Sequence, residues 1–197
     1  MNAPRLVSHA FYRTPIINQH TTWPGNNGPR FCTVATTYMF LHSSVIAGYL
    51  RNRPGPAPEK LNGVYTDYGE GRGTQIADYI ERHTTLTYVQ FQGWSSKSLV
   101  DAQLSLGFPV PIGVSHFGGA QFHLIGTNAG DGVSYDIAKG KSHPRDSSWQ
   151  YPSGHWAIVV GFDKSYYYIN DPDSGTMLRW GRDGFAEHGP YMVRVSG

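Results

Sequence analysis

The chain is poor in cysteine, with Cys32 as the only one among 197 residues. A single thiol cannot form an internal disulfide, and no pair of cysteines has the spacing of a zinc site. Disulfide-rich scaffolds and cysteine-ligated zinc folds are therefore excluded. Cysteine usage does not indicate a cellular compartment.

Long apolar runs are also missing. No stretch approaches the ~20 apolar residues of a membrane span. The first twenty residues, MNAPRLVSHAFYRTPIINQH, hold no apolar core behind a basic start, so no secretory signal is predicted. We expect a soluble protein that is cytoplasmic as made. Reaching a virion, or acting as a released lytic enzyme, would need a route supplied by something else.

Charged residues are sparse, at 15% of the sequence against the usual ~25%. The net charge is +2, and no run of like charge forms a footprint for nucleic acid or a membrane surface, so neither partner is expected. Gly (24), Pro (13) and Tyr (13) are plentiful, which indicates many turns and short strands. The length fits one domain, residues 1–197.

The order of the predicted elements gives the fold class. Apolar residues at helical spacing predict helices over 33–50, 74–83 and 95–107, and an extended arm or short strand precedes them at 14–19. One strand is predicted at 86–92. After Gly107 the pattern is that of strands, at 108–114, 122–127, 132–138, 155–162, 165–172 and 191–196, with a turn at 127–132. Helices followed by strands predict an α+β domain with a cleft between a helical half and an antiparallel half.

Cys32 lies at the start of the first predicted helix. The unpaired N–H groups there carry partial positive charge, which favours the thiolate over the thiol. A cysteine in this position is a candidate nucleophile. The alternative is a small buried apolar residue.

Two residues later in the chain are candidate partners for the thiol. His155 opens the apolar strand 155–162, and Asp171 closes the aromatic-rich strand 165–172. If the two strands pair as a hairpin, both residues lie at its open end. The carboxylate then holds the imidazole so that its other nitrogen faces Cys32. The alternatives are a histidine at the rim of the core and an aspartate of an ordinary turn.

An oxyanion also needs hydrogen-bond donors. The side-chain amide of Gln19 and the backbone N–H of Cys32 are the candidates, and Asn26 and Asn27 compete with Gln19 for the role. Asn27 and Trp156, which follows the candidate base, are also assigned to substrate binding.

The order of these motifs resembles a known family. An early Gln, a Gly-Pro-x-x-Cys leading a helix, LGFPVPIGV and GHWAIVVGFDKSYYYINDPDSG are similar to the papain-like cysteine peptidases of the bacteriocin-processing type. These are the peptidase domains fused to bacteriocin exporters, together with their free-standing relatives. The resemblance covers about residues 15–190, and in it WGRDGFAEHG matches a short helix after the Asp-Pro loop.

The resemblance implies a papain-like α+β fold, in which the nucleophile helix packs on an antiparallel sheet, and no cofactor. It implies Cys32 as nucleophile, His155 as base, Asp171 as orienting acid and Gln19 as oxyanion donor. The chain departs from the family in two ways. The interval between Gln19 and Cys32 is longer than in many relatives, and residues 116–153 form an insertion that we expect to be a lid or a specificity arm over the cleft.

The sequence therefore predicts a cysteine peptidase or amidase that uses a Cys-His-Asp triad. The expected substrate is a peptide, including the peptides of peptidoglycan, for an enzyme of phage or bacterial origin. One alternative is an inactive papain-like module of a larger assembly that binds through exposed aromatic residues. Candidates for such binding are Trp94, Trp149 and Tyr151.

Metal-dependent hydrolysis is a second alternative. Its candidate ligands are His116, His123, His143 and His188, with Asp131 or Asp136. The spacing between His116 and His123 differs from the i, i+4 pair of a zinc helix, and no metal site is predicted.

Overall fold

The structure is a computed structural model that describes residues 10–19, 31–51, 73–93, 95–114, 121–122, 154–183 and 191–197. Its helices are α1 (Cys32–Leu41), the 3-10 helix η2 (Ala47–Tyr49), α2 (Gly73–His83) and α3 (Lys97–Ser105). Its strands are β1 (Ala10–Phe11), β2 (Tyr88–Gln92), β3 (Val110–Val114), β4 (Gln121–Phe122), β5 (His155–Phe162), β6 (Tyr166–Asp171), β7 (Thr176–Gly181) and β8 (Tyr191–Ser196).

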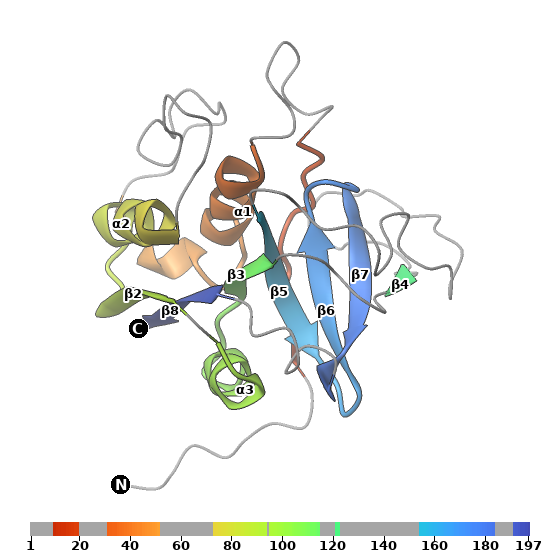
Figure 1. Ribbon diagram of the computed structural model, residues 1–197. Helices are drawn as coiled ribbons and strands as arrows, with labels where there is room; N and C mark the ends of the chain where they lie inside the picture. Colours follow the sequence, from red (N-terminus) through yellow and green to blue (C-terminus); the bar gives the residue numbers. More distant parts are fainter. Residues whose placement is uncertain are drawn as a thin grey trace, which may run out of the picture.

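The strands form one sheet in the order β2-β8-β3-β5-β6-β7-β4, with β1 beside β5. Every pairing is antiparallel. In Figure 1, α1 and α2 lie on one side of the sheet and α3 lies on the other. The α+β class predicted from the sequence is confirmed.

Strand β5 separates two hydrophobic cores because its side chains alternate between the two faces of the sheet. Ile158 and Val160 pack with residues of α1 and α2, whereas Ala157 and Val159 pack with residues of α3. All eight residues of β5 are buried. This fixes the strand that carries His155 at the centre of the molecule.

The first helix is shorter than the sequence predicted. The expected helix over 33–50 ends at Leu41, and only a 3-10 turn follows. The reason is a long-range contact: Ser44 donates its N–H to the carbonyl of Arg13 (2.9 Å), and the Ser43 hydroxyl donates to the same carbonyl (3.2 Å). The helix is also buried on nearly all sides, since nine of its ten residues are buried, rather than on the single face expected.

Strand β7 corrects a prediction from the sequence, because the family resemblance predicts a short helix that begins at Trp180. Trp180 and Gly181 belong to the strand, which pairs with β6 along its whole length. Arg182 and Asp183, the two described residues that follow the strand, are helical. A tight turn at 172–175 leads directly from β6 into β7, so the hairpin continues where the sequence resemblance suggested a helix.

The arm at residues 12–19 runs beside β5 and β6. Tyr12 donates its N–H to the carbonyl of Val160 (2.7 Å), and the Asn170 side chain donates to the carbonyls of Thr14 (3.1 Å) and Pro15 (3.2 Å). These contacts bring the start of the chain to the strands that carry His155 and Asp171.

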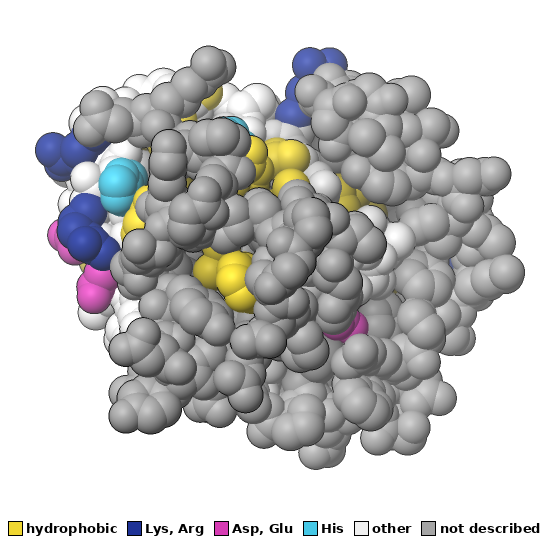
Figure 2. All heavy atoms as spheres, turned by 90° about the horizontal axis from the view of Figure 1, so that it is seen from above, with side chains coloured by type: hydrophobic (Ala, Val, Ile, Leu, Met, Phe, Trp, Pro, Cys, Tyr) yellow, Lys and Arg dark blue, Asp and Glu magenta, His cyan; other side chains and the backbone are white. Residues whose placement is uncertain are grey.

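Several predicted features lie outside the described residues. They are the strand at 132–138, the turn at 127–132 and all of the expected insertion 116–153 except β4, which pairs with β7. Trp94, Trp149 and Tyr151 are also outside. Figure 2 shows the surface from above. Apolar side chains lie near the middle of this view, and Lys and Arg side chains lie at separate places near its edge.

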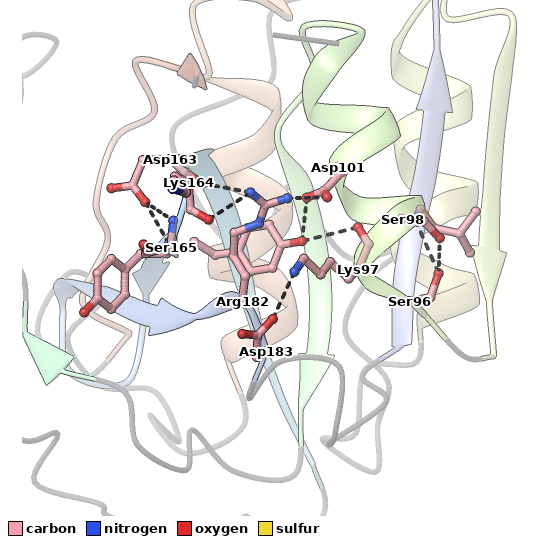
Figure 3. Close-up of polar contacts among 12 residues, drawn as sticks. Ser96, Lys97, Ser98, Asp101, Asp163, Lys164, Ser165, Arg182 and Asp183 are labelled. Carbon is pink, nitrogen blue, oxygen red and sulfur yellow. Dashed lines mark hydrogen bonds and ion pairs between the residues drawn. The ribbon is translucent and has the colours of Figure 1, made fainter. Parts of the chain in front are cut away.

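Polar contacts hold the turn between β5 and β6 to α3 (Figure 3). The Arg182 guanidinium pairs with Asp101 and donates to the carbonyl of Asp163 (2.9 Å). The Tyr167 hydroxyl donates to the same Asp101 carboxylate (2.6 Å). Nearby, Lys97 pairs with an exposed aspartate, Asp183 (3.0 Å). We refer to Arg182, Asp101, Tyr167 and Asp163 as the turn cluster.

Candidate active site

Cys32 is the first residue of α1. The side chain of its N-cap residue, Phe31, makes no capping hydrogen bond, and the first helical hydrogen bond runs from the Ala35 N–H to the carbonyl of Phe31 (2.8 Å). The N–H groups of Cys32, Thr33 and Val34 therefore have no partner within the helix. These groups carry partial positive charge and are available as donors to a neighbouring oxyanion.

His155 is the first residue of β5, where it lies opposite Val114 of β3. The chain enters the strand through Gly154, whose φ of +77° is a conformation that favours glycine. The imidazole Nε2 lies 2.6 Å from Oδ1 of Asp171, the last residue of β6. The exposed fractions of Cys32, His155 and Asp171 are 8%, 2% and 0%.

A β-bulge brings His155 and Asp171 to the same face. Gly161 pairs with Tyr168, but one residue is skipped and Val159 then pairs with Ile169. If this register continues beyond the Ile158–Asn170 pair, Asp171 lies opposite Ala157. The side chain of Ala157 points to the same face of the sheet as that of His155. Without the bulge, Asp171 would lie opposite Ile158 and its side chain would point to the other face.

The turn after β6 holds the Asp171 carboxylate. Oδ1 accepts the N–H of Asp173 (3.1 Å) as well as the imidazole, and Oδ2 accepts the N–H (3.1 Å) and the hydroxyl (2.7 Å) of Ser174. Gly175, with φ +66°, donates its N–H to the Asp171 carbonyl (2.9 Å). Hydrogen bonds of this kind stabilise an ionised carboxylate that is shielded from water.

The electrostatics of the site centre on His155. Burial alone would lower the pKa of the imidazole, but the hydrogen bond and negative charge of Asp171 oppose it. Cys32, which also hydrogen-bonds the ring, acts in the same direction, and together they raise the pKa of His155 to about 10. Since Nε2 is bound to Asp171, Nδ1 is the nitrogen left for the thiol. The structure thus brings these three predicted residues into contact.

Gln19 lies beside the same turn. Its N–H donates to the carbonyl of Pro172 (2.8 Å), and the neighbouring Asn18 side chain donates to the carbonyl of Ser174 (3.4 Å). The side chain of Gln19 is buried, and its Oε1 has no hydrogen-bond partner among the described residues. The long interval to Cys32 does not keep Gln19 from the turn that begins at Asp171. Its role as oxyanion donor stays a prediction.

The two predicted substrate-binding residues have different outcomes. Trp156 packs in the core against Phe91, with ring centroids 6.3 Å apart, and its ring fills the space that a side chain on Gly73 would need. This packing explains its burial, and a part in substrate binding stays a prediction. Asn27 lies outside the described residues, as does its neighbour Asn26.

Sequence reasoning missed the contribution of Ser174. The signal was present in DPDSG, because a serine three residues after an aspartate can return its N–H and hydroxyl to that carboxylate across a tight turn. The sequence presents an ordinary turn as the alternative to a functional aspartate, whereas in the structure the same aspartate belongs to the turn and contacts His155.

Within the described ranges, no three His, Cys, Asp or Glu side chains gather as a metal site. The candidate ligands His116, His123, His143 and His188, with Asp131 and Asp136, lie outside those ranges. As for membranes, none of the helices that the structure describes has the length and apolar character needed to cross a bilayer.

Comparisons with known proteins bear on the family and the fold. The model of the Peptidase_C39 like family matches residues 12–187. Among solved structures, a cysteine protease of Carica candamarcensis in complex with E-64 is similar, with a TM-score of 0.51 and 12% sequence identity. The alignment covers 96% of this chain and 98% of that protease, and at this identity it shows a shared papain-like fold. No curated protein matches the chain.

Proposed function

Because this chain belongs to the Peptidase_C39-like family and is a papain-like cysteine peptidase, we propose that it cleaves peptide bonds with Cys32, His155 and Asp171 as its catalytic triad. One observation carries the proposal: a buried imidazole contacts a thiol at a helix N-terminus and, through its other nitrogen, a buried carboxylate. Each group has the partner that its role requires.

In the first step, the Cys32 sulfur attacks the carbonyl carbon of the scissile bond as a thiolate. The carbon–oxygen double bond becomes an oxyanion, which the N–H of Cys32 and the side chain of Gln19 stabilise. As the carbon–nitrogen bond breaks, His155 gives its proton to the leaving amine. The products of this step are a thioester on Cys32, a free amine and a neutral imidazole.

In the second step, the neutral imidazole takes a proton from water as the water oxygen attacks the thioester carbon. The carbon–sulfur bond breaks, the peptide leaves as a carboxylic acid that loses its proton to solvent, and the thiolate–imidazolium pair returns. Asp171 stays ionised throughout and stabilises the imidazolium. The raised pKa of His155 suits the resting state, in which the imidazole already holds the proton that the amine will receive.

For the substrate, we extend the proposal to the peptides of bacterial peptidoglycan, cut by an enzyme of phage or bacterial origin. Its support is the sequence, in which the expected lid at 116–153 is rich in Gly, His, Ser and aromatic residues that suit a polar, extended peptide. Release of free amino groups from purified cell walls, compared with release from casein, tests this choice of substrate.

The triad itself is tested without a substrate, by the rate of Cys32 alkylation with iodoacetamide from pH 4 to 9. Wild type is compared with His155→Ala, and His83→Ala on α2 is the matched histidine control. We expect fast alkylation well below pH 8 in wild type and in the control, and a collapse to ordinary thiol behaviour in His155→Ala.

Equal profiles in wild type and His155→Ala would overturn the triad. They would favour the alternative of an inactive binding module, in which Cys32 is a structural residue. A collapse in both histidine variants would assign the effect to a general loss of structure, and the melting temperature of each variant checks for this.

A further inference from the structure

The Asp171 carboxylate has two oxygens with different surroundings. Oδ1 faces the imidazole of His155, at 2.6 Å, and Oδ2 faces the hydroxyl of Ser174, at 2.7 Å. Beyond Ser174, its Oγ lies 2.7 Å from Oγ1 of Thr176, the first residue of β7. Four side chains thus follow one another in a line of short hydrogen bonds that begins on β7 and ends at the base.

The direction of this line is fixed by the number of protons. A hydroxyl has one proton to donate, and the Ser174 hydroxyl donates its proton to Asp171. The contact between Ser174 and Thr176 therefore requires Thr176 to be the donor. Each hydrogen bond polarises the next one, and all of them are directed toward the negative charge of the carboxylate.

The backbone explains why these residues meet. Asp171 and Thr176 form the last pair of the β6–β7 ladder, and the turn between them places Ser174 over the carboxylate. Gly175 gives the turn its left-handed residue, and an added Cβ there would lie 2.6 Å from Asn18. The turn is thus held on its outer side by the arm that carries Gln19.

We infer that Ser174, supported by Thr176, is a positioning residue that holds the Asp171 carboxylate in the rotation in which Oδ1 faces His155. This inference rests on the proposed triad, because a positioned carboxylate matters only if His155 acts on Cys32. Ser174 touches neither the thiol nor the imidazole in any contact described above, so its effect reaches the thiol through Asp171.

The test uses Ser174→Ala, which removes the hydroxyl, and Ser174→Thr, which keeps it. The matched control is Ser165→Ala, at the exposed turn at the other end of the β5–β6 hairpin. The readout is the iodoacetamide rate of Cys32 as a function of pH, with the melting temperature measured in parallel. His155→Ala is carried in the same experiment.

We expect Ser174→Ala to lower the alkylation rate at pH 6 about tenfold, the size of one lost hydrogen bond to a charged group. The rate above pH 9 should not change, because the thiolate then forms without the imidazolium. Ser174→Thr should restore the profile, and Ser165→Ala should match wild type. A structural role alone would lower the melting temperature and leave the pH profile in place.

A wild-type profile in a folded Ser174→Ala, together with a collapsed profile in His155→Ala, would overturn the inference and leave the triad standing. An unchanged profile in His155→Ala would instead overturn the triad and the inference together. If Ser174→Ala does not fold, Thr176→Val tests the same line one step further away. There we expect about a threefold loss at pH 6, and no loss would overturn the inference.

Discussion

The two ends of the β5–β6 hairpin each hold an aspartate in the same local structure. At the closed end, Oδ1 of Asp163 accepts the N–H groups of Ser165 (2.7 Å) and Tyr166 (2.8 Å). At the open end, Asp171 accepts N–H groups from the turn that follows it in the same way. By local sequence and turn chemistry, the two carboxylates are near equivalents.

They differ in their side-chain partners and in burial. Asp163 is partly exposed and accepts the hydroxyl of Tyr168 (2.5 Å), and Arg182 lies nearby as a permanent cation. Asp171 is fully buried and faces an imidazole. A phenol and a guanidinium do not exchange protons near neutral pH, whereas an imidazole does. The same turn motif therefore holds a structural carboxylate at one end and, in the proposed triad, a catalytic one at the other.

Removing each carboxylate in turn tests most directly whether Asp163 and Asp171 have different roles. Asp171→Ala should lower kcat/KM for peptide hydrolysis about 10²- to 10⁴-fold, because the imidazolium loses the group that orients it and stabilises its charge. Asp163→Ala should change kcat/KM less than about threefold, since it acts far from the thiol. Initial rates on a quenched fluorescent peptide pool measure both. Similar losses in the two variants would contradict the distinction between the two ends.

The second prediction concerns stability at the closed end. Arg182→Met should lower the free energy of unfolding by about 2–4 kcal/mol. The largely buried Asp101 carboxylate loses its cation, and the backbone carbonyls of Asp163 and Lys164 lose a hydrogen-bond donor. The two side chains of this pair are only 14% and 21% exposed. Urea denaturation followed by tryptophan fluorescence measures the change, and the low-pH alkylation rate of Cys32 should stay as in wild type.

Lys97→Met is the matched control, since it removes the other cation–carboxylate pair of Figure 3. Its partner Asp183 is 96% exposed, so we expect a loss below about 0.5 kcal/mol. Equal losses in the Lys97 and Arg182 variants would show that burial does not set the strength of these contacts.

A further prediction separates the two ends by pH. The pKa of His155 is raised from 6.5 to about 10, so its contribution to stability is complete below pH 6.5 and is lost as the pH rises through 10. For Asp163, burial alone would raise the pKa. The Tyr168 hydroxyl, the turn N–H groups and Arg182 lower it below 3.8, so its contribution is lost as the pH falls below that value.

Melting temperatures from pH 3 to 10.5 test these signs. The difference in melting temperature between wild type and His155→Gln should become smaller only on the alkaline side. The difference between wild type and Asp163→Asn should become smaller only on the acid side. A difference for His155→Gln that grows toward pH 10 would contradict the raised pKa of His155.

The sequence predicted those parts of the fold whose signals are local. The bounds of β5 and β8 match the predicted strands, since both segments are bordered by turns or breaks in the pattern. The end of α1 could not be predicted, because the groups that stop it belong to the arm near Arg13. Strand β7 was not predicted, because the resemblance to the peptidase family favoured a helix that begins at Trp180.

The sequence predicted that Cys32, His155 and Asp171 would lie together, as they do, but it did not predict the bulge between β5 and β6, and the catalytic roles of the three residues stay a prediction. A hairpin without irregularity would have brought Asp171 near His155 but onto the opposite face. The bulge between Val159 and Gly161 places the side chains of Asp171 and His155 on the same face of the sheet. No single residue in GHWAIVVGF predicts this bulge. The role of Ser174 could not be predicted for a different reason. A serine in a turn becomes important for function only if the carboxylate that it hydrogen-bonds is itself functional.

The order of the groups along the chain, together with the burial of α1, has a consequence for biosynthesis. Cys32 leaves the ribosome first, and His155 and Asp171 follow more than 120 residues later. A helix buried on nearly every side has no stable position until the strands that cover it exist. The nascent polypeptide therefore carries the thiol before the segment that contains its proposed base, and the site can assemble only after β5 and β6 have been made.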